Sequence, residues 1–273
     1  MGMSHHIGSE LTSAAWSEVC NELIHRCCSL YPENFVGVCQ LPQSQGVSPA
    51  NSIAELERCV KELGFRGALV NGFSQAGTPE TCLYYDLPQY WGFWETLQKL
   101  DVPFYLHPRN PIASWAQIYD GHPWLMGPTW AFGQETAVHA LRLMGSGLFD
   151  AYPRLKIVVG HMGEGLPFSM WRVDNRNAWA GFKPKYKAKK PIADYFHQNF
   201  WLTTSGNFRT QTLIDAMLEV SADRIRGFLD GSGHYAEPLA GVMGRMDGTP
   251  DVLRVIARRL AHVSAAAASP TPE

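Results

Sequence analysis

Short apolar segments alternate with helical patterns along this chain, and that alternation limits its fold more than any other feature. The apolar segments lie at residues 35–41, 65–71, 103–107, 156–159, 200–204 and 224–230. Apolar residues at helical spacing predict helices over residues 10–30, 52–63, 90–100, 132–144 and 210–220, and after Pro167. Strands that are joined by helices form a parallel sheet through right-handed crossovers. The sequence therefore predicts an α/β fold.

The number of strand–helix units indicates an incomplete barrel. The units recur at intervals of roughly 30 to 45 residues, which suits a (β/α)8 TIM-type barrel, and about six of the eight units that such a barrel needs are recognisable. No strand pattern precedes the helix at residues 10–30, so we expect the missing units on the amino-terminal side. We interpret residues 1–230 as the truncated barrel. Residues 231–273 are weakly patterned and end in an Ala-rich segment typical of a disordered tail.

For two of the predicted helices the sequence also indicates which side faces the core, and two of the predicted loops are long. Trp16, Val19, Leu23 and Ile24 are helically spaced in residues 10–30, which predicts an amphipathic helix. In residues 90–100 we expect the inner side to carry Trp91 and Trp94. Residues 72–90 are rich in Gly, Pro, Tyr and Gln and predict a loop. Residues 112–130 predict a long irregular excursion over a barrel mouth or in a subunit contact.

Composition narrows the possible partners. The chain has 273 residues, of which 45% are hydrophobic and 18% charged, enough to build a full-sized core. A formal net charge of -2 gives no basic footprint for nucleic acid. No apolar window is long enough to span a bilayer, so we expect no membrane partner. The six cysteines lie in the first third of the chain without CxxC pairs, which favours reduced thiols. Reduced thiols and the absence of a signal-peptide pattern together predict a cytoplasmic protein.

The stretch LKIVVGHMGEGLPFSMWR, residues 155–172, combines a strand, turn glycines and chemically capable side chains. His161 follows the β-branched run, and Glu164 comes three residues later between Gly163 and Gly165. A carboxylate within one turn can hold the second ring nitrogen of a histidine and fix its tautomer. The pair is therefore interpreted as an oriented acid/base, the alternative being a capped strand end with a solvated Glu.

Polar side chains also end three other predicted strands. Asn71, His107 and Asp230 are each the last residue of a strand pattern, as His161 follows another. In a TIM-type barrel the carboxyl ends of the strands meet at one mouth, where two histidines and an aspartate can hold a divalent metal such as zinc or manganese. The structural alternatives are a strand-ending turn for Asn71 and a purely structural role for His107.

The sequence resembles a known family over about residues 65–220. The resemblance rests on long strings, namely GALVNGFSQ, YYDLPQYW, LDVPFYLHPRNP, IYDGHPWLMGPTWAF, QETAVHALRLM, GHMGEGLPF and TTSGNFRTQTLIDA. They are similar to the metal-dependent nonoxidative aromatic-acid decarboxylases of the amidohydrolase superfamily, specifically the γ-resorcylate and 2,3-dihydroxybenzoate decarboxylases. The resemblance implies a carboxy-lyase that releases carbon dioxide from an ortho-hydroxybenzoate.

The resemblance also implies roles for individual residues. It makes His107 a metal ligand, His161 with Glu164 the catalytic pair, and Asp230 both a metal ligand and the group that protonates the ring carbon. The implied cofactor is a divalent metal, zinc or manganese, with magnesium as a further candidate.

Two further positions match the family's substrate site. Asn71 and Arg172 correspond to substrate-binding positions, and the residue equivalent to Arg172 reaches into a neighbouring subunit. The resemblance therefore implies a homodimer or homotetramer that binds a small aromatic carboxylic acid.

The chain departs from the family pattern at two places. The family begins with a strand carrying Glu-x-His or Glu-x-Ala, which supplies one or two metal ligands. No such strand is recognisable here, because His5 and His6 lack the preceding Glu. The segment GFLDGSGHYAE around Asp230 also differs from the family's last strand. We therefore expect a chain of decarboxylase ancestry that can be inactive as it stands.

Two alternatives stay open at this point. The stretches VGVCQLPQSQGVSP and ELERCVKE are similar to the oxalomesaconate hydratases of the same superfamily, which favours a hydratase. The missing strands favour a noncatalytic fragment that assembles with intact subunits.

Overall fold

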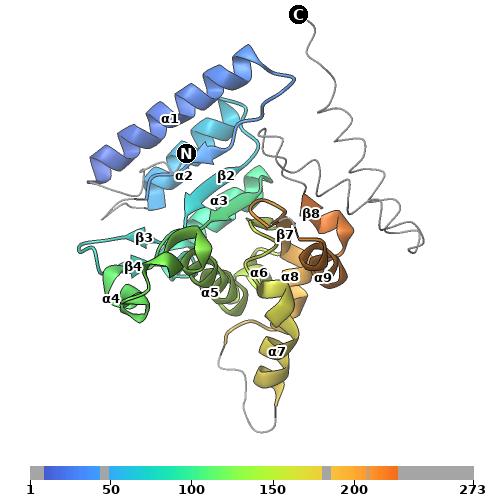
Figure 1. Ribbon diagram of the computed structural model, residues 1–273. Helices are drawn as coiled ribbons and strands as arrows, with labels where there is room; N and C mark the ends of the chain where they lie inside the picture. Colours follow the sequence, from blue (N-terminus) through green and yellow to red (C-terminus); the bar gives the residue numbers. More distant parts are fainter. Residues whose placement is uncertain (1–8, 44–48, 180–185, 208, 227–273) are drawn as a thin grey trace, which may run out of the picture.

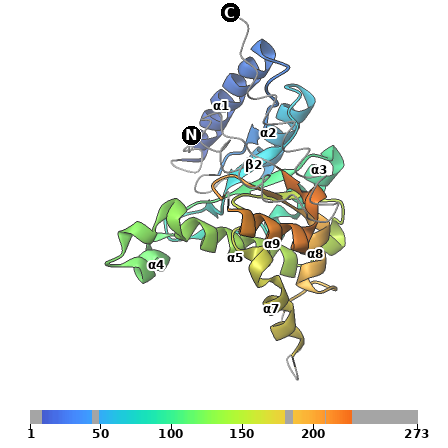
Figure 2. The same cartoon turned by 45° about the vertical axis from the view of Figure 1, so that its right-hand side comes forward.

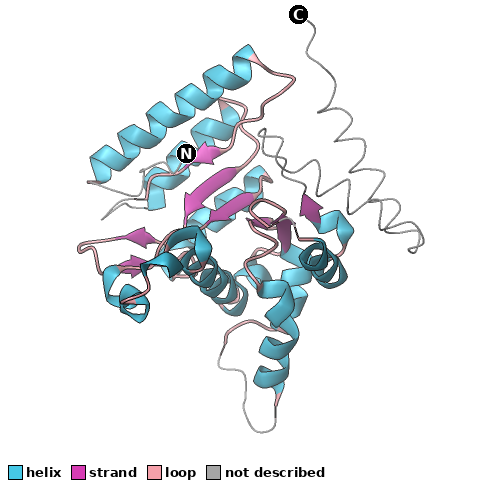
Figure 3. Ribbon diagram, in the orientation of Figure 1, coloured by secondary structure: helices cyan, strands magenta, loops and turns pink. Residues whose placement is uncertain are grey.

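The computed structural model describes residues 9–43, 49–179, 186–207 and 209–226 and shows an open parallel sheet with helices packed along it (Figures 1 and 3). The sheet has six strands in the order β1-β2-β5-β6-β7-β8. Their bounds are β1 Cys39–Gln40, β2 Ala68–Asn71, β5 Phe104–His107, β6 Ile157–Val159, β7 Phe200–Thr203 and β8 Ile225–Arg226. All neighbouring pairs are parallel. Within the described residues β1 and β8 are the two edges, so the predicted incomplete α/β barrel is confirmed.

The helices lie close to their predicted places. Their bounds are α1 Glu10–Leu30, α2 Pro49–Lys61, α3 Trp91–Leu100, α4 Ala113–Ala116, α5 Ala131–Gly145, α6 Leu148–Ala151, α7 Leu166–Ala178, α8 Ile192–Asn199 and α9 Thr210–Val220. Both α6 and α8 escaped prediction because a helix of one or two turns leaves little periodic signal. Figures 1 and 2 show α7 extending away from the body of the molecule.

Several predicted boundaries were wrong. The strand predicted at residues 35–41 is regular only at Cys39–Gln40, and the part of residues 224–230 that follows β8 lies outside the described residues. The predicted loop at residues 72–90 contains an antiparallel pair, β3 Ser74–Gln75 with β4 Cys82–Leu83, and the short 3-10 turn η1 Pro88–Tyr90. The excursion at residues 112–130 contains α4 and the 3-10 turns η2 Gln117–Tyr119, η3 Pro123–Leu125 and η4 Gly127–Thr129; a last such turn, η5 Ala222–Arg224, precedes β8. Elements of two or three residues are shorter than a sequence period, so the pattern could not reveal them.

Alternation along the strands separates the core from the barrel interior. In β5, Phe104 and Leu106 are fully buried in the main apolar cluster, whereas Tyr105 and His107 are partly exposed. Successive strand residues point to opposite faces. Phe104 and Leu106 therefore face the helices, and Tyr105 and His107 face the interior of the open barrel.

Helix α1 is present as predicted, but of its four predicted apolar positions only Ile24 packs against the core. Trp16, Val19 and Leu23 are 47%, 54% and 59% exposed, while the polar residues Ser17 and Asn21 are fully buried. In α3, likewise, Trp94 is buried but Trp91 is only half-buried; Phe93 and Leu97 complete the inner side. An apolar pattern predicts a helix, but it cannot show that a polar side chain of that helix has a hydrogen-bond partner in the core.

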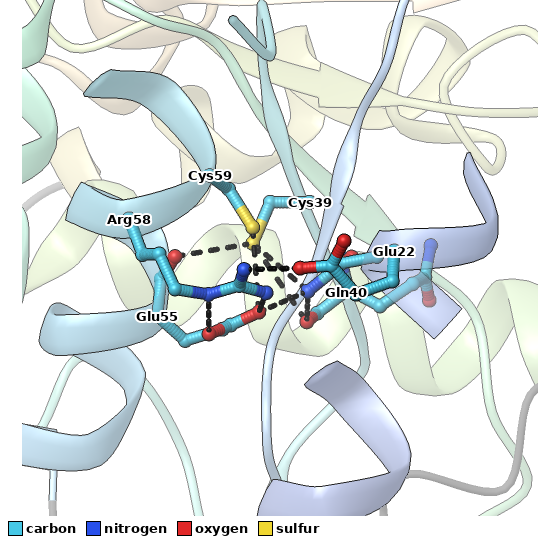
Figure 4. Close-up of polar contacts among 7 residues, drawn as sticks. Glu22, Cys39, Gln40, Glu55, Arg58 and Cys59 are labelled. Atoms are coloured by element: carbon cyan, nitrogen blue, oxygen red, sulfur yellow. Dashed lines mark hydrogen bonds and ion pairs between the residues drawn. The ribbon is translucent and has the colours of Figure 1, made fainter. Parts of the chain in front are cut away.

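That partner of α1 is the edge strand β1. The Asn21 amide donates to the carbonyl of Gln40 at 3.0 Å, and the backbone N–H of Gln40 donates to Asn21 Oδ1 at 2.8 Å. Asn21 also donates to Glu55 at 2.6 Å, and Arg58 joins Glu55 to Glu22 (Figure 4). Asn21 thus occupies the place that a neighbouring strand would take and covers the hydrogen-bonding groups of the sheet edge.

Two further features are the length of the helices and the state of the cysteines. Over the described ranges, none of the helices has the length and apolar character needed to traverse a lipid bilayer. All six cysteines are free thiols, and Cys39 and Cys59 lie beside the Glu55 network (Figure 4).

Candidate active site

His161 and Glu164 meet at the carboxyl end of β6. His161 Nδ1 lies 2.5 Å from Glu164 Oε1. The His161 side chain is 33% exposed, and that of Glu164 is only 6% exposed. The predicted oriented pair is therefore formed, and it leaves the other ring nitrogen, Nε2, free of the carboxylate.

A left-handed backbone turn brings the two side chains together. His161, Met162, Gly163, Glu164 and Gly165 all have positive φ, between 52° and 78°. Gly163 N–H donates to the Gly160 carbonyl at 2.7 Å, and Met162 N–H donates to the Thr203 carbonyl of β7 at 2.8 Å. Non-glycine residues in this region cost about 1–2 kcal/mol each. Because three of the five are not glycine, the turn is strained, and such strain is typical of functional sites.

The surroundings of His161 favour its protonated form. The hydrogen bond to Glu164 raises the pKa of His161 above the ordinary value, burial partly opposes that rise, and the charge of Glu164 adds to it. A Cβ atom on Gly206 would lie 2.7 Å from His161 Cδ2, so the backbone of the loop after β7 packs directly against the ring.

Asn71 and His107 lie side by side at the same end of the sheet. They are register partners of β2 and β5, and Gly72 N–H donates to the His107 carbonyl at 2.8 Å. His107 Nδ1 lies 3.0 Å from the Pro108 carbonyl, and burial lowers the pKa of His107. The ring is therefore held neutral with Nδ1 as donor, which leaves Nε2 for a metal, as metal-binding histidines require.

Gln43 holds the end of β2 in position, and the sequence analysis did not identify it. Its side chain is fully buried, accepts from Asn71 N–H at 2.6 Å and donates to the Gly72 carbonyl at 3.1 Å. A single glutamine after a short strand carries no motif; its only signal was its place just past a strand end.

Among the described residues, His107 is the one predicted metal ligand whose surroundings can be examined. His107 has the tautomer and the burial that suit a ligand, but no group of three or more His, Cys, Asp or Glu residues that could hold an ion occurs in the described ranges. Asp230, the other proposed ligand, lies outside the described residues.

Arg172 does not lie in this constellation. It is exposed on α7, the helix that projects from the body of the molecule (Figure 2). Its neighbours Phe168 and Trp171 are 89% and 75% exposed. The chain thus places Arg172 where it can meet another molecule rather than its own His161.

A separate surface hollow lies away from the candidate residues. It has a volume of about 520 Å³ and is lined mainly by α5 and by residues 86–91, with Tyr186 and Lys187. None of the predicted site residues lines it.

Gly133 in the first turn of α5 leaves room for the Glu164 carboxylate. A Cβ atom on Gly133 would lie 3.0 Å from Glu164 Oε2, closer than an ordinary contact. We expect Gly133→Ala to displace the carboxylate and lower the pKa of His161, measured by NMR titration of the histidine ring. Alanine is about 1 kcal/mol better than glycine inside a helix, so the melting temperature should hold or rise. Gly92→Ala in α3, where the nearest atom would be 4.0 Å away, is the matched control. An unchanged His161 titration in Gly133→Ala would contradict the role.

Comparison with known proteins places this chain in a family. The model of the amidohydrolase family matches residues 1–208. The chain therefore belongs to the amidohydrolase family.

Several relatives with high sequence identity are aromatic-acid decarboxylases. A γ-resorcylate decarboxylase from Polaromonas sp. (strain JS666) is 71% identical over 194 residues, which cover 71% of this chain and 59% of the relative. The structure of a dihydroxybenzoic acid decarboxylase from Polaromonas sp. JS666, with bound manganese and the inhibitor 2-nitroresorcinol, has 57% identity and a TM-score of 0.82, covering 88% of this chain and 73% of that chain. A 2,6-dihydroxybenzoate decarboxylase complexed with 2,6-dihydroxybenzoate has 52% identity and a TM-score of 0.85, covering 93% and 78%. The chain spans about three fifths of the length of the curated decarboxylases it matches.

The hydratase alternative is less well supported. A 2-keto-4-carboxy-3-hexenedioate hydratase from Sphingobium sp. (strain NBRC 103272 / SYK-6) is 36% identical over 171 residues, which cover 62% of this chain and 47% of that protein. This identity is about half that of the decarboxylase.

Proposed function

We propose that this chain catalyses the metal-dependent, nonoxidative decarboxylation of an ortho-hydroxybenzoate, with 2,6-dihydroxybenzoate as the substrate. The main observation behind the proposal is the His161–Glu164 pair, with a distance of 2.5 Å between the two side chains. It lies at the carboxyl ends of the strands, where Asn71 and His107 also lie. The names of the manganese-bound and substrate-bound relatives support the same reaction class.

The reaction needs a proton at the ring carbon that bears the carboxylate. We assign its delivery to Asp230; the carbon–carbon bond then breaks, its electron pair restores the aromatic ring, and carbon dioxide leaves. His161 in its protonated form stabilises the negative charge on substrate oxygen, because Glu164 holds its other nitrogen. Asn71 supplies a neutral hydrogen-bonding group beside His107. His107 and Asp230 would hold manganese or zinc, which supplies a Lewis acid and a template for substrate oxygens when bound.

Assembly and location complete the proposal. We assign Arg172 to the substrate site of a neighbouring copy in a homodimer or homotetramer, which its exposed place on the projecting helix α7 supports. We also propose a cytoplasmic location, which the six free thiols support.

The test is release of carbon dioxide from 2,6-dihydroxybenzoate after incubation with manganese and desalting. Wild type is expected to retain the metal and release carbon dioxide. His107→Ala is expected to lose retained manganese and at least about 100-fold in rate, since a ligand is removed. Wild type that retains no metal and releases no carbon dioxide would contradict the proposal and favour the noncatalytic fragment.

A further inference from the structure

Three hydroxyl groups converge beside the candidate catalytic pair. A Cβ atom on Gly160 would lie 2.8 Å from the Tyr105 hydroxyl, 3.5 Å from Ser205 Oγ and 3.8 Å from Thr203 Oγ1. Gly160 directly precedes His161. The hydroxyls therefore come from β5, from the end of β7 and from the loop after it, and they gather around a residue without a side chain.

Strand alternation places this hydroxyl cluster, defined as Tyr105, Thr203 and Ser205, on the interior of the open barrel. Tyr105 shares the interior face of β5 with His107, and the two rings lie 6.1 Å apart between centroids. The Tyr105 hydroxyl also reaches Gly160, the residue before His161, so the cluster is adjacent to the strand ends that carry both histidines.

The hydroxyl cluster has hydrogen-bonding capacity left over. Thr203 Oγ1 and Ser205 Oγ bond to each other at 2.7 Å. The Tyr105 hydroxyl has no hydrogen-bond partner among the residues that the structure describes. Each hydroxyl offers one donor and two acceptor positions, so a ligand oxygen between them can both donate and accept.

The chemistry of the cluster favours a neutral ligand group. The three side-chain atoms nearest to the Gly160 position are all hydroxyl oxygens and none carries a charge. A carboxylate would be bound more strongly by arginine or lysine, because their positive charge strengthens the hydrogen bonds. A phenolic hydroxyl, which both donates and accepts, matches the cluster.

We propose that Tyr105, with Thr203 and Ser205, recognises a ring hydroxyl of the substrate and makes the site specific for a dihydroxybenzoate over a monohydroxybenzoate. This assignment rests on the proposed function. Gly160 is part of it, because any side chain there would occupy the space that the hydroxyl reaches. The cluster distinguishes substrates by the polar groups it leaves unpaired when the ring hydroxyl is missing.

The experiment compares dissociation constants for 2,6-dihydroxybenzoate and 2-hydroxybenzoate by calorimetry in the presence of manganese. Wild type is expected to bind the dihydroxy compound about 10-fold more tightly, the equivalent of one well-formed hydrogen bond. Tyr105→Phe removes only the hydroxyl and is expected to bring that ratio close to one while leaving affinity for 2-hydroxybenzoate unchanged. Tyr31→Phe, on an exposed side chain, is the matched control.

Three outcomes separate the possibilities. A tenfold preference that survives both Tyr105→Phe and Gly160→Ala would overturn the assignment and leave the proposed function intact. If Tyr105→Phe lowers the affinity for both compounds equally and leaves the melting temperature unchanged, the assignment is also overturned, because the hydroxyl would then contribute to binding of either compound. If wild type binds neither compound, the proposed function fails and the assignment with it.

Discussion

Replacing Glu164 by glutamine is expected to lower the rate of carbon dioxide release by about 100- to 10,000-fold, the range attributed to a positioned acid or base. Glutamine keeps the size of the side chain but removes the negative charge that lies 2.5 Å from His161 Nδ1. The measurement is the rate at saturating 2,6-dihydroxybenzoate. Because the charge fixes the protonated form of His161, the loss should fall on turnover more than on substrate affinity.

The same variant should change the titration of His161 in a defined direction. In wild type the hydrogen bond to Glu164 raises the pKa of His161, so the stabilisation from this pair is fully present below the unfolded value and is lost as pH rises through the folded pKa. In Glu164→Gln the raising cause disappears and burial alone acts, so the pKa of His161 should fall below its ordinary value.

A second histidine–carboxylate pair supplies the control. His197 Nε2 lies 2.9 Å from Glu219 Oε1 on the helical side of the molecule, away from the strand ends. Glu219→Gln is expected to leave turnover unchanged. Equal activity losses in Glu164→Gln and Glu219→Gln would contradict a special role for Glu164.

The strand ends were predictable because their signals are local. A β-branched run followed by His161 and a Gly-x-Gly turn predicts both the strand and the meeting of the two side chains. His107 before two prolines likewise marks an extended segment. The positive φ of Met162 and of Glu164 itself was not predictable, since neither residue favours that conformation. The turn is held by contacts to β7, which are distant in sequence.

Groups that act across the sheet left no readable pattern. Gln43 positions Asn71 through hydrogen bonds between residues 28 and 29 positions apart. Tyr105 has the pattern of an ordinary strand residue, and only the folded structure shows that its hydroxyl reaches Gly160 on the neighbouring strand's end. The buried polar face of α1 went unrecognised for the same reason, because its partner is the backbone of an edge strand.

Asn21→Ala is expected to cost about 2–5 kcal/mol of unfolding free energy. It leaves the N–H and the carbonyl of Gln40 without their partners at 2.8 Å and 3.0 Å. A fully buried unsatisfied group costs about 1–3 kcal/mol, and because Gln40 is only half-buried, the cost of its two groups lies below the upper limit of that sum. The substitution also removes a donor to Glu55, whose pKa is raised by burial but lowered by a greater amount through Arg58 and Asn21, so the carboxylate should become easier to protonate. The measurement is urea unfolding at neutral pH.

Asn51→Ala is the matched control, because its exposed amide also joins α2 to α1, through Glu10 at 2.6 Å. Exposed pairs of this kind contribute about 0–1 kcal/mol, so this variant should stay close to wild type. If Asn21→Ala costs no more than Asn51→Ala, the edge of β1 is not held by Asn21. If it costs the expected amount and the protein self-associates as well, the polar face of α1 is what keeps an open sheet edge from pairing with another chain.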